Sequence, residues 1–252
     1  MSELKILFED EHIIAVDKPS GLLVHPSFIA PRSTPHLTGL LKAYLGHSAY
    51  TIHRLDRPTS GVILFGKNAD VARALNEQFT GRKVKKTYLC VTRGYTDEEG
   101  FIDYALKEKL DKIADKYASV DKPAQDAQTA YRRLATVELP IAVGKYPQSR
   151  YSLVEVKPHT GRKHQIRRHM KHVAHPLVGD TKHGDLRHNK AFKDHYGVER
   201  LLLMATQLEF DHPVSGERTT VTAPVDDFID QLFRGFGWDG LYPLAEKDSG
   251  EQ

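Results

Sequence analysis

The chain has 252 residues and a mass of 28.5 kDa, with 40% hydrophobic and 27% charged side chains. These proportions fit a folded globular protein and exclude a disordered or fibrous one, and the length suffices for one substantial hydrophobic core. The net charge of +3 and the pI near 8.8 are too small by themselves to indicate a nucleic-acid partner.

The composition also bears on the compartment. No run of eighteen apolar residues suggests a membrane span, and residues 1–11 lack the apolar core of a signal peptide. The single cysteine, Cys90, excludes an internal disulfide and a multi-cysteine zinc site. We therefore expect a cytoplasmic protein with no membrane partner, in which Cys90 packs in the core.

The first part of the chain predicts strands and helices in an irregular order. Two strand-like runs, 6–8 and 13–16, lead into a Pro-Ser-Gly turn at 19–21. Apolar spacing then predicts helices over 36–45 and 69–79, a buried strand over 61–66, and a strand over 85–93.

The second part begins with residues 103–128, which are charged and weakly patterned and are interpreted as a long insertion or extended hairpin. A helix is predicted to begin near Thr160, with its hydroxyl capping the free amides. Further strands are predicted over 129–138, 151–156, 207–210 and 219–222, followed by a closing helix over 226–233 and a loose tail after Pro243.

This order of elements favours an α+β fold with a mostly antiparallel sheet and flanking helices, because strands and helices do not alternate strictly. No glycine-rich phosphate loop of the dinucleotide or nucleotide-triphosphate kind is present. We find no repeat and no linker, and we expect one domain.

The basic residues are unevenly distributed. Residues 157–179 contain six Lys or Arg, five His and no acid, and a second basic cluster occupies 82–86. An isolated charged run is commonly a solvated face. Here two such runs flank apolar segments. A solvated face and a phosphate-binding surface are then about equally favoured.

The segment 53–61 (HRLDRPTSG) is a dense polar loop directly before a predicted buried strand, a place where functional groups are often presented. Asp56 stands between Arg54 and Arg57, and nearby cations favour the ionised carboxylate that a nucleophile requires. Spacing alone favours the alternative that Asp56 caps a turn or forms a surface ion pair.

The segment 160–170 (TGRKHQIRRHM) places an arginine beside an apolar stripe. If it is helical, Ile166, Met170 and Val173 face the core and Arg167 adjoins them. An arginine at the margin of a core needs an anion, and Asp56 would satisfy it. The alternative is a solvated arginine on phosphate, which is the interpretation for Arg162, Lys163 and Arg168.

The regular spacing of His169, His172 and His175 invites a metal interpretation, which we disfavour. The three positions turn about the helix axis, no acid or cysteine joins them, and the surrounding cations would repel a metal. We expect phosphate contact or packing, and no metal.

With these motifs in view, the sequence resembles the RluA family of pseudouridine synthases. The loop at 53–61 carries the most specific match, and three further motifs follow the family in order: 17–22 (DKPSGL), 86–88 (KTY), and 160–169 with 175–180 (HPLVGD). The resemblance implies the pseudouridine synthase fold with a central RNA-binding cleft. It covers residues 1–243, taken as one catalytic domain of two lobes sharing a sheet, with 244–252 as a flexible tail. No separate N-terminal RNA-binding module is expected, because the first motif begins near residue 10.

The resemblance also implies roles for particular residues. Asp56 would be the catalytic aspartate, Tyr88 the ring that packs against the target base, and Arg167 the ion-pair partner of Asp56. Arg54 would fill the space left by the flipped nucleotide, and Leu203 would form an apolar wall. The expected RNA-binding residues are Arg54, Arg57, Arg162, Lys163, His164, Arg168 and Leu203. The sequence departs from the family at Met204, where a histidine is common.

Within the family, residues 110–116 (LDKIADK) and 182–187 (KHGDLR) are most similar to members that modify tRNA, which implies uridine 65 of tRNA as the target. The implied isomerisation detaches the base from the sugar and rejoins it through C5, with no cofactor and no metal, and we expect a monomer. Ribosomal RNA is an alternative substrate. Two other functions remain open: hydrolysis of the glycosidic bond, and RNA binding without catalysis.

Overall fold

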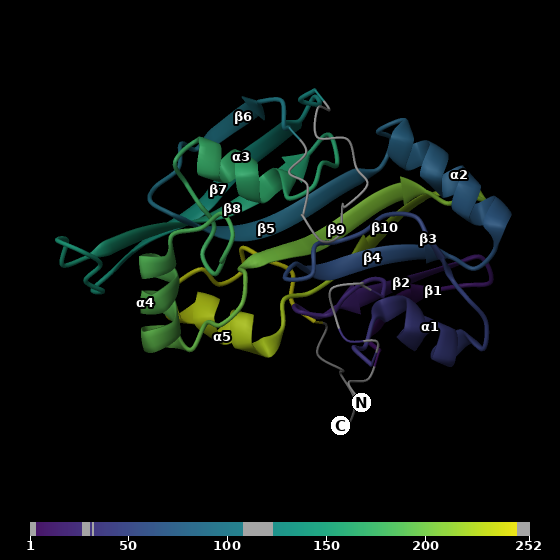
Figure 1. Ribbon diagram of the computed structural model, residues 1–252, viewed down its shortest axis with the longest axis horizontal. Helices are drawn as coiled ribbons and strands as arrows, with labels where there is room; N and C mark the ends of the chain where they lie inside the picture. Colours follow the sequence, from purple (N-terminus) through teal and green to yellow (C-terminus); the bar gives the residue numbers. More distant parts are fainter. Residues whose placement is uncertain (1–3, 27–30, 32, 108–122, 246–252) are drawn as a thin grey trace.

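The computed structural model describes residues 4–26, 31, 33–107 and 123–245. Within these ranges one ten-stranded sheet runs the length of the molecule, and five helices flank it (Figure 1). The strands are β1 (Ile6–Glu9), β2 (Ile13–Lys18), β3 (Tyr50–Thr51), β4 (Ser60–Gly66), β5 (Lys85–Arg93), β6 (Glu99–Asp103), β7 (Gln128–Leu139), β8 (Ser149–Pro158), β9 (Leu203–Asp211) and β10 (Arg218–Thr222). The helices are α1 (Leu37–Leu45), α2 (Ala69–Thr80), α3 (Gln165–His172), α4 (Leu186–Tyr196) and α5 (Asp227–Gly235).

The strand order is β1-β2-β4-β9-β5-β8-β7-β6, with β10 paired to β9 and β3 paired to β4. Only the β4–β9 pair is parallel among the described strands, and all other pairs are antiparallel. The α+β architecture with a mostly antiparallel sheet and flanking helices is therefore confirmed.

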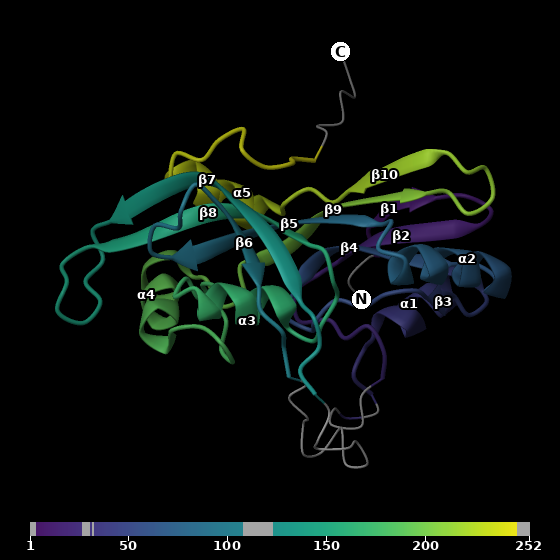
Figure 2. The same cartoon turned by 90° about the horizontal axis from the view of Figure 1, so that it is seen from above.

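The first half of the sheet is built on β4, whose seven residues are all buried. Its continuous apolar run, Val62 to Phe65, suits a strand that is covered on both faces. Helices α1 and α2 pack at this end of the sheet (Figures 1 and 2), where Leu41 and Leu75 join the same core cluster as β4.

The second half is built on β5, whose residues alternate between two cores. Leu89 and Val91 pack in a cluster with α4 and α5, whereas Cys90 packs in another with Ile166 and Met170 of α3. Cys90 is fully buried, so its predicted role in core packing is confirmed.

The two halves meet where β4 runs parallel to β9, with Ser60 opposite Met204 and Gly61 opposite Ala205. Gly61 has a φ of +108°, and a Cβ at this position would lie 2.2 Å from the carbonyl oxygen of Ala205. Glycine is therefore required both by the backbone conformation and by the close approach of the neighbouring strand. The loop 53–59 that precedes β4 lies directly beside this junction.

One predicted helix start was wrong. Helix α3 begins at Gln165, not near Thr160. The Thr160 hydroxyl donates to Oε1 of Gln165 and accepts from the backbone N–H of Gln128, so it ties the loop before α3 to β7 and does not cap the helix. The intervening residues form a turn that ends at His164, in the left-handed conformation.

The ends of the predicted insertion at 103–128 pair with each other. Asp103 lies opposite Gln128, and Leu106 forms an antiparallel bridge with Gln125, as an extended hairpin requires. Residues 108–122, including the motif at 110–116, lie outside the described residues, as do residues 246–252 of the predicted tail.

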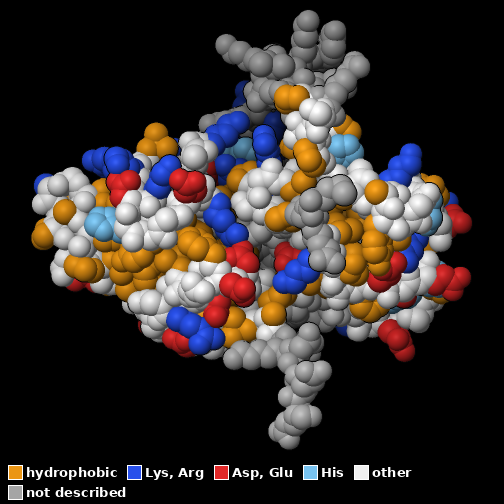
Figure 3. Space-filling view, turned by 90° about the horizontal axis from the view of Figure 1, so that it is seen from below, with side chains coloured by type: hydrophobic (Ala, Val, Ile, Leu, Met, Phe, Trp, Pro, Cys, Tyr) orange, Lys and Arg blue, Asp and Glu red, His pale blue; other side chains and the backbone are white. Residues whose placement is uncertain are grey.

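The face that carries α4 and α5 has mixed charge. Figure 3 shows Lys and Arg side chains interspersed with Asp and Glu on this face. Ion pairs near these helices join Lys190 to Asp194 within α4, and Arg200 to Asp226, the residue before α5. None of the described helices is both long and apolar enough to cross a membrane.

Candidate active site

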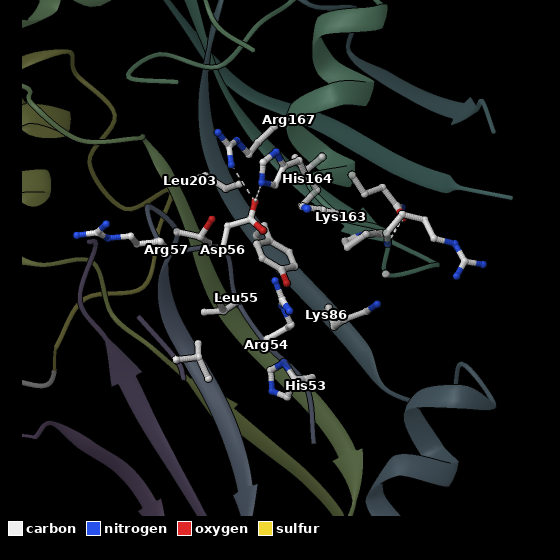
Figure 4. A pocket seen from close by; sticks show the side chains of 18 of the residues that line it. His53, Arg54, Leu55, Asp56, Arg57, Lys86, Lys163, His164, Arg167 and Leu203 are labelled. Atoms are coloured by element: carbon white, nitrogen blue, oxygen red, sulfur yellow. Dashed lines mark hydrogen bonds and ion pairs between the residues drawn. The ribbon is translucent and has the colours of Figure 1, made fainter. Parts of the chain in front are cut away.

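An open cleft of about 1250 Å³ lies over the β4–β9 junction. The cleft is lined by nine of the ten residues predicted for the site: Arg54, Asp56, Arg57, Tyr88, Arg162, Lys163, His164, Arg167 and Leu203. The tenth, Arg168, does not line the cleft; its Nη2 donates to the backbone carbonyl of Lys107. Segments that are distant in the sequence thus converge on one cavity (Figure 4).

The loop that carries Asp56 is anchored at its start by His53. The Nε2 of this ring accepts the backbone N–H of Leu64 in β4, and the ring stacks on Phe79 of α2 with centroids 4.7 Å apart. Burial, with the nearby charge of Lys86, lowers the pKa of His53 to about 3. His53 is therefore a neutral structural group that fixes the loop to the sheet.

A buried ammonium group holds the loop from the other side. Lys18 is fully buried, and its Nζ donates to the carbonyl oxygens of Pro19, Leu22 and Arg57 at 2.9–3.0 Å. Burial lowers the pKa of Lys18 to about 8, against the opposing effect of Asp56. Lys18 thus joins the turn after β2 to the residue that follows Asp56.

Asp56 and Arg167 meet across the cleft, although they are 111 residues apart. Nη1 of Arg167 lies 3.0 Å from Oδ2 of Asp56 (Figure 4). The arginine side chain is only 5% exposed, whereas the Asp56 side chain is 21% exposed and borders the cavity. The carboxylate is therefore accessible, while its ionic partner is not.

Asp180 holds this arginine in place. Its two carboxylate oxygens accept from Nε and Nη2 of Arg167 at 2.7 and 2.8 Å, a bidentate pair in which the Asp180 side chain is fully buried. Burial raises the pKa of Asp180, but the hydrogen bonds and charge of Arg167 outweigh it, and the pKa lies below its ordinary value. Asp180 binds two of the three guanidinium nitrogens, so the third, Nη1, points at Asp56.

A pair of histidines stands beside the carboxylate. Nε2 of His164 lies 3.8 Å from Oδ2 of Asp56, and its Nδ1 lies 2.8 Å from Nε2 of His183. Burial lowers the pKa of His164, against the opposing charge of Asp56 and with the charges of Arg167 and Lys182. A lowered pKa favours the neutral ring near pH 7. The sequence predicted His164 as an RNA-binding residue, and in the structure its ring lies beside the Asp56 carboxylate.

The walls next to Asp56 are apolar. Tyr88 lies on β5, and Leu203, which is 3% exposed, lies at the start of β9. Burial raises the pKa of the Tyr88 phenol, and the charge of Asp56 raises it further, so the phenol stays protonated. A flat aromatic group entering the cleft would meet these two side chains.

The rim of the cleft is basic. Arg54 and Arg57 are exposed on the Asp56 loop, and Arg162 and Lys163 come from the loop before α3. Lys86 adds a cation whose pKa burial lowers to about 8. Such cations around a cavity with Tyr88 and Leu203 in its wall suit a polyanion that carries flat bases, one of which enters the cavity.

The three regularly spaced histidines, two in α3 and one after it, have separate partners. His169 is buried, with its ring nitrogens on the Thr129 hydroxyl and the Tyr104 carbonyl; His172 stacks on Tyr104; and Nδ1 of His175 lies 3.0 Å from the carbonyl of Arg93. Among the described residues, no three His, Cys, Asp or Glu side chains are grouped so as to hold a metal ion.

Four residues that build the site were not predicted: Lys18, His53, Asp180 and His183. Lys18, His53 and Asp180 stand in the motifs that carry the family resemblance, but no role was predicted for them. Asp180 had a visible signal, because it is the first acid after the acid-free run 157–179. His183 had none, since its contact depends on the turn between Asp180 and α4.

Comparisons with known proteins identify the family of the chain. Residues 12–172 match the family model described as RNA pseudouridylate synthase. A tRNA pseudouridine synthase C of Pectobacterium carotovorum subsp. carotovorum is 50% identical over 96% of this chain, which spans 65% of that protein's length. The protein of the same name from Yersinia pestis is 50% identical to this chain, and the match covers 97% of this chain and 95% of the Yersinia pestis protein.

Among solved structures, the human RNA pseudouridylate synthase domain containing 4 superimposes with a TM-score of 0.68 at 26% identity, covering 92% of this chain and 93% of that one. The sheet and its flanking helices therefore form a pseudouridine synthase fold, as the motifs predicted.

Proposed function

The chain belongs to the RNA pseudouridylate synthase family and is an isomerase that acts on RNA, and from this premise we propose that it converts uridine 65 of tRNA to pseudouridine with Asp56 as the nucleophile. The tRNA substrate is supported by the names of relatives that are 50% identical over nearly the whole chain. The observation that carries the aspartate is the contact of Asp56 with the buried Arg167 at the cleft.

The reaction breaks the bond from N1 of the base to the ribose and forms a bond from C5, with loss of the C5 proton. An accessible carboxylate suits three routes equally: addition to C6 of the base, attack on C1′ of the ribose, or removal of a sugar proton. Asp56 is assigned the reacting role in each of them. Arg167 holds the carboxylate in place while the base turns.

The target base must leave its stack to reach Asp56, at a cost of a few kcal/mol. We assign Tyr88 and Leu203 to apolar contact with the extruded base, and Arg54 to the gap that the base leaves. Arg57, Arg162 and Lys163 would bind phosphates, which offsets the cost of unstacking. We further propose a monomer, because one chain supplies all of these groups, and a cytoplasmic location, where tRNA is matured.

The proposal is tested with tRNA that carries tritium at uridine C5. We expect the protein to release label and to form pseudouridine, and Asp56→Asn to release none, because the amide is not a nucleophile or base. The matched control is Asp70→Asn, since Asp70 is an exposed residue of α2 paired with Arg73; it should release label at the wild-type rate. A tRNA with cytidine at position 65 should release no label from that site.

Each rival function gives a different result. Free uracil would indicate a glycosidic hydrolase, and tight tRNA binding with unchanged tRNA would indicate a binding protein. Release from ribosomal RNA but not from tRNA would contradict the substrate assignment. Label release that survives Asp56→Asn would contradict the nucleophile.

A further inference from the structure

The two histidines beside Asp56 form a chain of contacts that the reaction as described does not use. His183 Nε2 lies 2.8 Å from His164 Nδ1, and His164 Nε2 lies 3.8 Å from Oδ2 of Asp56. Resting on the function proposed above, we propose that His183 is a positioning residue: its ring N–H fixes His164 as the tautomer that points an Nε2–H at the Asp56 carboxylate.

The tautomer follows from the charges around the ring. If His164 carried its proton on Nδ1, a bare lone pair on Nε2 would face a carboxylate oxygen 3.8 Å away, which is unfavourable. With the proton on Nε2, the ring points a donor at the carboxylate, and Nδ1 must accept. Nδ1 of His164 lies 2.8 Å from Nε2 of His183. Nε2 of His183 must therefore carry the proton and donate this hydrogen bond.

The backbone of His164 shows that this ring position is held against a conformational cost. His164 has φ 56° and ψ 31°, a left-handed conformation that residues with a Cβ rarely adopt. It occupies the N-cap position of α3 but makes no side-chain capping bond. Its ring is turned instead to His183 and Asp56.

His183 belongs to the turn that Asp180 organises. Oδ1 of Asp180 accepts the backbone N–H groups of Lys182 and His183, while the same carboxylate holds Arg167. His183 is 6% exposed. One buried carboxylate therefore places both groups that face Asp56, the guanidinium directly and the imidazole through His183.

Both groups engage the same oxygen. Within the described part of the chain, Arg167 and His164 both approach Oδ2 of Asp56. The separation of 3.8 Å is longer than a hydrogen bond, as is common for reacting groups without substrate. We expect it to shorten when RNA fills the cleft, so that Oδ2 is held by two donors and Oδ1 reacts.

The test compares two substitutions of His183. Gln can place an amide N–H where the ring Nε2–H stood, whereas Phe keeps the ring and removes the donor. We expect His183→Phe to lower the single-turnover rate at saturating tRNA about tenfold, the effect of one lost positioning hydrogen bond, with Kd for tRNA unchanged. His183→Gln should retain most of the rate. His47→Phe, at an exposed site after α1, is the control and should leave both quantities unchanged.

A second measurement needs no RNA. The ¹⁵N resonances of the His164 ring should report the Nε2–H tautomer in the wild type and in His183→Gln, and a mixture of tautomers in His183→Phe. Thermal unfolding of each variant checks that it is folded.

The proposal is overturned if wild-type His164 carries its proton on Nδ1, if His183→Phe keeps the full rate, or if Gln and Phe lose equal amounts of rate. A wild type that makes no pseudouridine would overturn the proposed function instead, and the tautomer result would still decide the role of His183.

Discussion

At the scale of single residues, the site depends on an arginine that is shared unequally between two carboxylates. Asp180 binds it in a bidentate, fully buried pair, and Asp56 receives one donor at the cavity edge. A buried arginine loses its solvation and is stable only with anionic partners. Asp180 therefore stabilises the buried guanidinium of Arg167 and also orients it toward Asp56.

We expect Asp180→Asn to lower the free energy of unfolding by roughly 3–5 kcal/mol, because it leaves a buried guanidinium without its main anion. Urea denaturation measures this loss. Asp194→Asn, which removes an exposed partner of Lys190, should cost at most about 0.5 kcal/mol. Equal effects of the two substitutions would contradict the assigned role of Asp180.

The pH dependence of that loss has a definite sign. The pKa of Asp180 is lower in the folded protein than in the unfolded chain. Its contribution is thus complete above the unfolded pKa of about 3.9 and disappears as pH falls through the folded value. The stability difference between wild type and Asp180→Asn should be constant near neutral pH and should shrink below about pH 4.

Residue spacing alone could not identify this site. It favoured a turn or a surface ion pair for Asp56, and the family motifs were needed to reverse that interpretation. The pairing of Arg167 with an anion followed from its place beside an apolar stripe. Lys18 and His183 could not be found, because their partners are a set of backbone carbonyls and a ring 19 residues away.

At the scale of elements, the junction of β4 and β9 positions the loop of Asp56. Gly61 is the residue that lets the two strands approach. We expect Gly61→Ala to lower the free energy of unfolding by at least about 2 kcal/mol, since the methyl group would strain the backbone and overlap the Ala205 carbonyl. Chemical denaturation provides the measurement.

The control for this substitution is Gly216→Ala. Gly216 also has a positive φ, +74°, but no atom lies within 4 Å of the added Cβ. Gly216→Ala should lower the free energy of unfolding by about 1 kcal/mol, because only the backbone conformation is strained. If the two substitutions cost the same, the close approach of β9 is not the constraint at Gly61.

The predicted elements were reliable where burial imposes a clear pattern. The all-buried β4, the amphipathic α2 and the alternating β5 match their predicted ranges within one or two residues. Helix α4 was not predicted, because only Ala191 and Phe192 of its eleven residues are buried and most of the others are polar. The start of α3 was wrong because tertiary contacts of the preceding loop, not local capping, set it.

At the scale of the whole molecule, binding of RNA should be governed by the cations around the cleft rather than by net charge. The face with α4 and α5 carries both signs (Figure 3), whereas the loop before α3 and the Asp56 loop supply Arg54, Arg57, Arg162 and Lys163. A long anion would therefore bind on the cleft side of the sheet.

Arg168 tests how far this surface extends beyond the cleft. We expect Arg168→Ala to raise Kd for tRNA several-fold and to lower the slope of log Kd against log salt by about one unit, with little change in the single-turnover rate. Lys190→Ala removes the same charge from the mixed face and should leave the slope unchanged. A large loss of rate at saturating tRNA in Arg168→Ala would place that side chain nearer the chemistry.

The central place of β9 couples the two halves of the site. Residues 203–211 lie between β4 and β5, so β9 joins the half-sheet that carries Asp56 to the half-sheet that carries Arg167. A chain in which β9 has not yet paired has both ionic partners but does not bring them together. We therefore expect the cleft to form late in folding, together with the pairing of β9.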